Sequence, residues 1–158
     1  MSIFEDLLSA VVDELRDTTA TGSAAAALIR EGVDAVIPQD KDSVISVTLG
    51  PSNTQYLVTN RIDWMTTLEV HCEARKLPTH RSASHAVAGV LADAINRLSP
   101  RNPLFMARLS GLGVNAINPE DGNGGIDRDV AATSDQVGAA TYMLVIGHAT
   151  DPDLTPRN

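Results

Sequence analysis

The chain has little sulfur and few aromatic side chains. Its one cysteine, Cys72, allows neither a disulfide framework nor a cysteine-based zinc site within one chain, so we expect folding in a reducing compartment. We interpret Cys72 as a small buried hydrophobe rather than a nucleophile. Aromatic residues make up 3% of the chain and hydrophobic residues 43%. The predicted core is therefore built from small and β-branched side chains.

Basic residues are also scarce, with 12 Lys and Arg against 20 Asp and Glu and a net charge of -8. This balance argues against binding to nucleic acid or to anionic membranes, since both need a basic surface. It is compatible with a wall along which DNA slides without sticking. No stretch approaches the roughly 20 apolar residues of a membrane span, and acids interrupt the opening MSIFEDLLSAVVDEL, so we expect a soluble protein without a signal peptide.

Residues 62–75 (IDWMTTLEVHCEAR) carry the strongest pattern in the chain. Every second side chain from Ile62 to Ala74 is apolar apart from one threonine, and those from Asp63 to Arg75 are polar apart from one methionine. This alternation predicts a strand with one buried face. At roughly 3.3 Å per residue the strand would reach about 46 Å, more than a domain of this length needs for its own core. A strand that outruns its domain is suited to contacts with neighbours.

Helical spacing appears in three places. Ser2 and Glu5 form a capping-box pattern before an amphipathic helix over residues 3–17. An alanine-rich helix is expected over residues 23–32, with Gly32 as its C-cap. An apolar stripe predicts a third helix within residues 81–98, capped by Ser82 or Ser84 and lying against the sheet.

The remaining segments read as strands and loops. We expect an extended segment at 33–38, a turn at 39–43, a strand at 44–49 and a loop at 50–53. Whether residues 56–75 form one bent strand or two is open. Residues 104–109 are extended or helical, 113–117 extended, 119–138 mostly loop, and 141–147 a central strand. The order predicts an α+β fold with a mostly antiparallel sheet, one very long strand or hairpin, and helices packed on one face. We expect one domain over residues 1–150 and a mobile tail over 151–158.

No motif indicates an active site or a metal site. Residues 119–130 (PEDGNGGIDRDV) resemble the middle of a calcium loop, but Pro119 and Val130 occupy the positions of its first and last ligands. A solvated acidic loop is the better interpretation. His80 and His85 are five apart, the wrong spacing for one helical face, no HExxH pattern occurs, and His71 is interpreted as a surface histidine. Nucleophile motifs such as GxSxG and SxxK are absent. We therefore expect neither enzymatic activity nor a cofactor.

Several segments in order resemble one protein family. These are REGVDAVIPQDKDSVISVTLGP, then EVHCEAR at the end of the long strand, then SASHAVAGVLADAINRL and TYMLVIGHA. In their order and general sequence character, residues 11–150 resemble the tail terminator (tail completion) proteins of tailed bacteriophages, the lambda gpU-like class. The resemblance implies a six-membered ring at the head-proximal end of the tail tube, with no catalytic residues.

The resemblance also implies the partners and the location. The ring would contact further copies of itself, the tail tube protein, the neck or connector protein and, in contractile tails, the sheath. DNA would only pass through its lumen, no membrane would be involved, and the protein would reside in the virion after folding in the bacterial cytoplasm. The alternatives are another head-tail joining protein, such as a neck or head-closure subunit, and a small ligand-binding domain or enzyme.

Three groups of residues are candidates for protein contacts. The polar face of the long strand reads as a salt-bridging surface, the connection 51–61 would project from one end of the sheet, and the acidic loop 121–129 would meet the tube or an adjoining subunit. Both loops are equally compatible with plain solvent-exposed segments. The candidates are Glu69, His71, Glu73 and Arg75 on the strand, Thr54, Tyr56 and Arg61 in the connection, and Asp121, Asp127, Arg128 and Asp129 in the loop.

Overall fold

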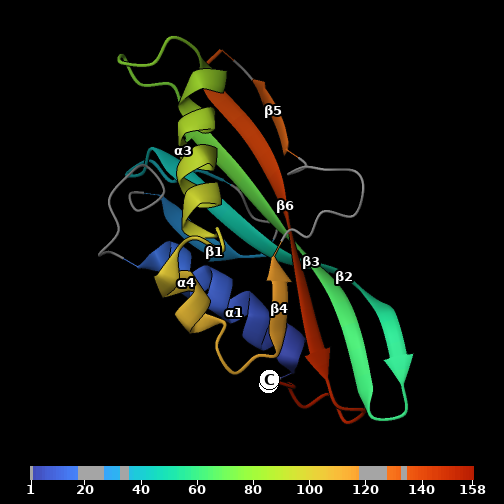
Figure 1. Cartoon of the computed structure of the whole chain (residues 1–158). Coiled ribbons are helices and arrows are strands. Elements are labelled where there is room, and N and C mark those ends of the chain that lie inside the picture. The colour runs from blue at the N-terminus through green and yellow to red at the C-terminus, as the bar shows by residue number, and fades with distance from the viewer. Residues whose placement is uncertain (1, 18–26, 33–35, 118–127, 133–134) are drawn as a thin grey trace.

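The computed structural model describes residues 2–17, 27–32, 36–117, 128–132 and 135–158 (Figure 1). The elements are α1 (Ile3–Arg16), β1 (Leu28–Glu31), β2 (Ser43–Val58), β3 (Arg61–Arg75), α3 (Ala83–Arg97), α4 (Pro103–Arg108), β4 (Val114–Ile117), β5 (Arg128–Ala132) and β6 (Val137–Thr150). The strands form a six-stranded sheet of order β1-β2-β3-β6-β4, in which β5 also pairs with β6.

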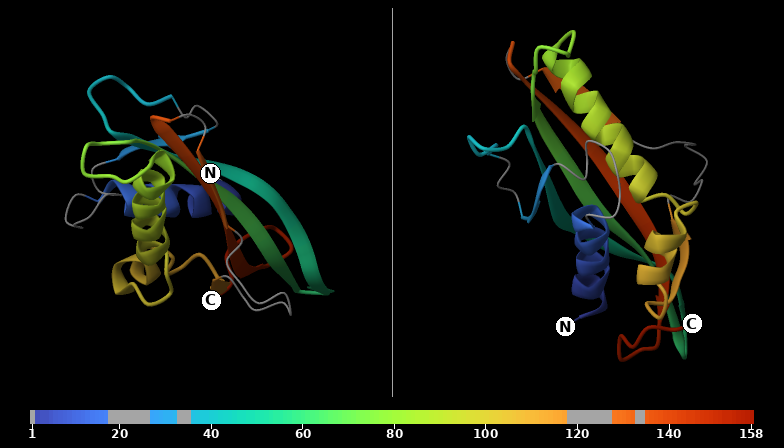
Figure 2. Two further views of the ribbon diagram at one scale, coloured as in Figure 1. Left: turned by 90° about the horizontal axis from the view of Figure 1, so that it is seen from above. Right: turned by 90° about the vertical axis from the view of Figure 1, so that its left-hand side faces the viewer.

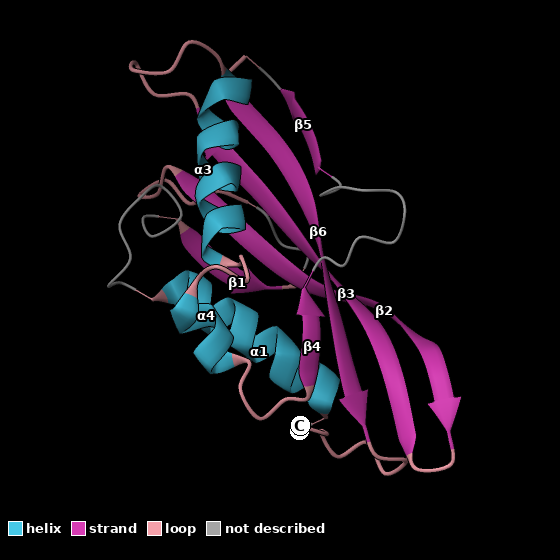
Figure 3. Cartoon of the chain, in the orientation of Figure 1, coloured by secondary structure: helices cyan, strands magenta, loops and turns pink. Residues whose placement is uncertain are grey.

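The fold is α+β with a mostly antiparallel sheet, as predicted. Only the pairing of β1 with β2 is parallel among the described strands. The helices gather on one side of the strongly twisted sheet (Figure 2), and the long strands β2, β3 and β6 run side by side through the molecule (Figure 3). The apolar core lies between these two layers.

Strand β3 is the centre of the sheet, because β2 pairs with one of its edges and β6 with the other over most of its length. Its side chains at Thr66, Leu68, Val70, Cys72 and Ala74 are buried, and those between them are half-buried. The predicted alternation is therefore confirmed. Burial raises the pKa of the Cys72 thiol to about 12, in keeping with a packing residue rather than a nucleophile.

Helix α1 begins at the predicted capping box. The Ser2 side chain accepts from the Glu5 backbone N–H, and the Glu5 carboxylate accepts from the Ser2 backbone N–H. Helix α3 is capped by Ser82 and buries the predicted stripe, including Val87, Val90 and Leu91. Its small residues Ala88, Gly89 and Ala92 are exposed on the opposite face.

The helix predicted over residues 23–32 is wrong where the structure describes it. Leu28–Glu31 form β1, which pairs with Val44–Val47. That pairing places Ile29 in the core at 7% exposure, and such tertiary pairing overrides a weak local helix preference. Gly32 does adopt a positive φ of 97°, as a C-cap would, but it ends a strand.

The predicted loop at residues 50–53 is also wrong, because β2 continues through it with register shifts between Leu49 and Ser52 and between Thr54 and Tyr56. Pro51 is tolerated there because β1 leaves β2 at Val47, so no described strand needs a hydrogen bond from that edge. A turn at Thr59 and Asn60 then separates β2 from β3, so residues 56–75 are parts of two strands.

Further along the chain, residues 104–109 belong mainly to helix α4, whose N-cap Asn102 accepts from the Leu104 backbone N–H. The loop predicted over residues 119–138 is partly wrong, since β5 and the start of β6 lie within it. Strand β5 pairs with β6, and the start of β6 pairs with β3. This long-range pairing determines the conformation of both segments. The predicted central strand at 141–147 is confirmed within β6.

The C-terminal residues fold back toward the end of β6. Arg157 N–H donates to the Ala149 carbonyl at 2.9 Å, and Pro156 bridges to Thr150. The Arg157 guanidinium also hydrogen-bonds the Asn60 carbonyl in the β2–β3 turn. The mobility expected for residues 151–158 stays a prediction, and these contacts are the ones that mobility would break.

Candidate protein interface

The first candidate group lies together on the sheet face opposite the helices. Glu69, His71, Glu73 and Arg75 occupy alternate positions of β3 and are all half-buried. The His71 ring approaches the Thr141 Oγ1 at 3.0 Å through Nδ1 and the Glu73 Oε1 at 3.3 Å through Nε2. The predicted polar face is therefore present, and its contacts join β3 to β6.

Residues paired across neighbouring strands extend this polar face from β3 to the strands on either side. Ser46, His71 and Thr141 lie in one row of partners, and Asp129 of β5 continues it. The backbone of Arg128 pairs with Tyr142, one step along the same strand. Two residues predicted in the acidic loop thus lie in a strand beside the polar face, which the sequence pattern did not indicate. Asp121 and Asp127 lie outside the described residues.

Arg75 has a structural role at the end of this face. Its Nη2 donates to the carbonyls of Ile37 at 2.9 Å and Pro38 at 3.1 Å, which ties residues 37–38 to β3. A cavity of about 480 Å³ lies beside it, lined by Val36, Ile37, Glu73, Arg75, Lys76, Gln136 and Val137. Arg75 is thus committed to backbone carbonyls rather than to the ion pairs expected of it.

The second candidate group lies where the β2–β3 hairpin extends beyond the helices, at the lower right of Figure 1. From Thr48 to the end of β2, no side chain that the structure describes is buried. Thr54 is exposed, the backbone of Tyr56 pairs with Asp63, and Arg61 forms an ion pair with Asp63 at 2.8 Å. The predicted projection from one end of the sheet is present, as a strand hairpin instead of a loop.

An aromatic cluster anchors the base of this hairpin to α1. Phe4 packs edge-on against Trp64 with ring centroids 5.4 Å apart, and His148 stacks on Trp64 at 6.5 Å. The Trp64 Nε1 donates to the Thr150 Oγ1 at 3.0 Å. Thr66 Oγ1 lies 2.7 Å from the His148 Nε2. These contacts join the hairpin to α1 and β6.

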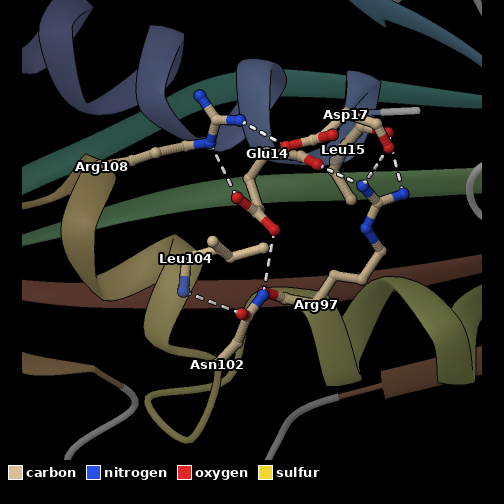
Figure 4. A network of polar contacts seen from close by, with 7 residues as sticks. All are labelled: Glu14, Leu15, Asp17, Arg97, Asn102, Leu104 and Arg108. Atoms are coloured by element: carbon tan, nitrogen blue, oxygen red, sulfur yellow. Dashed lines mark hydrogen bonds and ion pairs between the residues drawn. The ribbon is translucent and has the colours of Figure 1, made fainter. Parts of the chain in front are cut away.

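Sequence reasoning missed a buried polar network among the helices (Figure 4). The Glu14 carboxylate, 1% exposed, accepts from the Arg108 Nε at 2.8 Å and from the Asn102 Nδ2 at 3.0 Å. Arg97 donates to the carbonyls of Glu14, Leu15 and Asp17, which are the last acceptors of α1. The hydrogen bond that Arg108 donates to the Glu14 carboxylate raises the pKa of the Arg108 guanidinium. This network fixes α1 against α3 and α4.

Among the described residues, no group of three or more His, Cys, Asp and Glu side chains gathers as a metal ion would require. Within the same residues, no helix has both the length and the apolar character of a membrane span. The described part of the chain is thus an α+β domain whose distinctive surfaces are a polar sheet face and a projecting hairpin.

Comparison with known proteins finds matches in structure but not in sequence. No protein-family model matches the chain, and no curated protein matches it in sequence. A matching solved structure is the sheath/tube terminator of the PVC extracellular contractile injection system, in its extended state. The identity is 11% and the TM-score 0.39, over 98% of this chain and 60% of the neighbour, so this chain spans less than two thirds of that protein's length. Similarity at this level assigns neither a family nor a function.

Proposed function

We propose that the chain is a structural tail protein that forms a ring on the head-proximal end of a tail tube and ends its polymerisation. The observation that carries the proposal is the β2–β3 hairpin, which extends beyond the helices (Figure 1) and has no buried described side chain in β2 from Thr48 onward. Strand edges and half-covered sheet faces of this kind are suited to pairing with other subunits. The resemblance of residues 11–150 to tail terminators supports the same reading.

In this proposal the ring has six copies and acts through binding alone, without catalysis, metal or cofactor. Its partners are the tube protein on one side and the neck or connector on the other, with the sheath added in a contractile tail. The net charge of -8 suits a lumen that repels passing DNA. The protein would be assembled in the bacterial cytoplasm and would reside in the virion.

The test is to mix the purified protein with polymerising tail-tube protein and to image the products by negative-stain electron microscopy. Tubes of limited length with an extra ring at one end only are expected. Tubes that grow unchecked and uncapped, together with binding to portal-adaptor complexes, would instead indicate another head-tail joining protein. A monomer that binds small molecules would indicate the ligand-binding or enzymatic alternative.

A further inference from the structure

Two strand edges of the sheet are open at the same end of the molecule. Beyond Val47, where β1 ends, no described strand pairs with the outer edge of β2. On the other side of the sheet, β4 pairs with β6 through one edge, and no described strand pairs with its other edge. Open edges present unpaired N–H and C=O groups, which favour pairing with another strand.

The two open edges lie at the same level of the sheet. Thr54 pairs with Trp64, Trp64 with His148 and His148 with Val114, so one row runs from edge to edge. A second row runs from Ser52 through Thr66 and Ile146 to Ile117. Each step is antiparallel, so β4 runs antiparallel to β2. A second copy placed beside the first in the same orientation therefore brings its β4 antiparallel to β2 without a shift along the strands.

Both edges also lack charge. Strand β2 (SVISVTLGPSNTQYLV) has no charged residue, and none occurs between Leu109 and Ile117. Edges that must stay unpaired usually carry charges that prevent association. For a chain with a net charge of -8, contact between two copies is least opposed by repulsion where neither surface is charged.

Leu57, beside the open edge of β2, is exposed, and a hollow lies beside the open edge of β4. Leu57 is 68% exposed and pairs with Ile62, which shares its face with Trp64 and the buried residues of β3. On the same face, beside β4, a hollow of about 470 Å³ is lined by Met106, Leu109, Ser110, Gly111, Val114 and Asn158. Val114 lies two rows from Leu57 and on the same face, so a neighbouring copy would bring its Leu57 to the mouth of this hollow.

We propose that the open edge of β2 pairs with the open edge of β4 in a second copy, with Leu57 seated in the hollow beside Val114. The contact is head-to-tail, and it repeats into a closed ring when the rotation from each copy to the next adds up to a full turn. The sheets then form one continuous band around the ring. The inference rests on the proposed function, for which it supplies the contact between subunits.

The test uses cysteines placed across the proposed pair. A Thr54→Cys/Val114→Cys variant places one thiol on each edge in the same row, and Cys72 is fully buried and stays silent. A short bis-maleimide is expected to give a ladder of multimers on denaturing gels, ending at the ring size. In the matched control, Thr54→Cys/Asn115→Cys, the second thiol replaces a side chain whose Oδ1 lies on the opposite face beside Gly147, so no ladder is expected.

Leu57→Lys independently tests the proposed contact of Leu57 with the hollow beside Val114. Loss of one buried leucine contact predicts at least about a tenfold weaker self-association by analytical ultracentrifugation. Val36→Lys, at a site 71% exposed near the other end of the sheet, is expected to leave association unchanged. A chain that stays monomeric at all concentrations, or a ring whose double-cysteine variant gives no ladder, would overturn the inference. Tube capping by a ring without the ladder would leave the proposed function intact while removing this contact.

Discussion

His148 makes the stability of the domain depend on pH. Its side chain is fully buried against Phe4 and Trp64, its Nε2 lies 2.7 Å from the Thr66 Oγ1, and its Nδ1 has no hydrogen-bond partner among the described residues. This burial lowers the pKa of His148 from 6.5 to about 4, because the charged ring would lose its hydration.

The sign and size of the effect follow from linkage. The unfolded chain binds the His148 proton below pH 6.5, whereas the folded chain binds it only near pH 4, so stability falls as the pH decreases between these values. A pKa difference of about 2.5 corresponds to about 3 kcal/mol over the full range, and to about 2 kcal/mol between roughly pH 7.5 and pH 5.

The assay is urea unfolding of the wild type and of His148→Gln at both pH values. Glutamine keeps a polar group near Thr66 but does not titrate, so the wild type is expected to lose about 2 kcal/mol more than the variant on acidification. Carboxylates contribute equally to both proteins and cancel in the comparison. Equal pH dependence of the two proteins would show that His148 is not the source of the acid destabilisation. The control His85→Gln, at an exposed site, should keep the wild-type dependence.

Three further changes test the packing by urea unfolding of the isolated subunit. Gly138→Ala should lose about 1–3 kcal/mol, since an added Cβ would lie 2.3 Å from the Ala83 carbonyl oxygen; an unchanged stability would contradict the close approach of α3 to β6. Gly89→Ala, on the exposed face of α3, should gain about 0.5–1 kcal/mol, and a loss would indicate that the face is covered. Glu14→Ala should lower the free energy of unfolding by about 2–3 kcal/mol, because Asn102 and Arg108 lose their buried acceptor. A loss below about 0.5 kcal/mol would show that the network does not stabilise the fold.

The elements predicted correctly from the sequence are those whose pattern of buried side chains lies within the element itself. The alternation over residues 62–75 and the helical stripes of α1 and α3 record burial directly, because each side chain's exposure follows from its position in the element. Strand β1 escaped prediction because parallel pairing with β2 is a long-range interaction that four residues do not encode. The GPSN stretch has the composition of a loop, and it remains in a strand because it lies on an open edge at a shift in register.

The candidate interface, too, was predictable only where its cause is local. Alternation placed Glu69, His71 and Glu73 on one face, but their link to β5 depends on pairing between distant segments. Glu14 did carry a signal, since it lies on the apolar stripe of α1 with Leu7 and Val11 and so had to be buried. The lack of charge along β2 was visible in the sequence, yet its meaning depends on knowing that the edge is open.

Termination of tube growth can be measured as the length distribution of tail tubes assembled with increasing amounts of the protein, with the lengths determined by electron microscopy. We expect tubes to shorten until each carries one ring at one end. Leu57→Lys should have a much weaker effect at equal concentration, while Val36→Lys should act as the wild type does. Tubes whose lengths do not respond to the wild-type protein, and whose ends carry no ring, would contradict the proposed function.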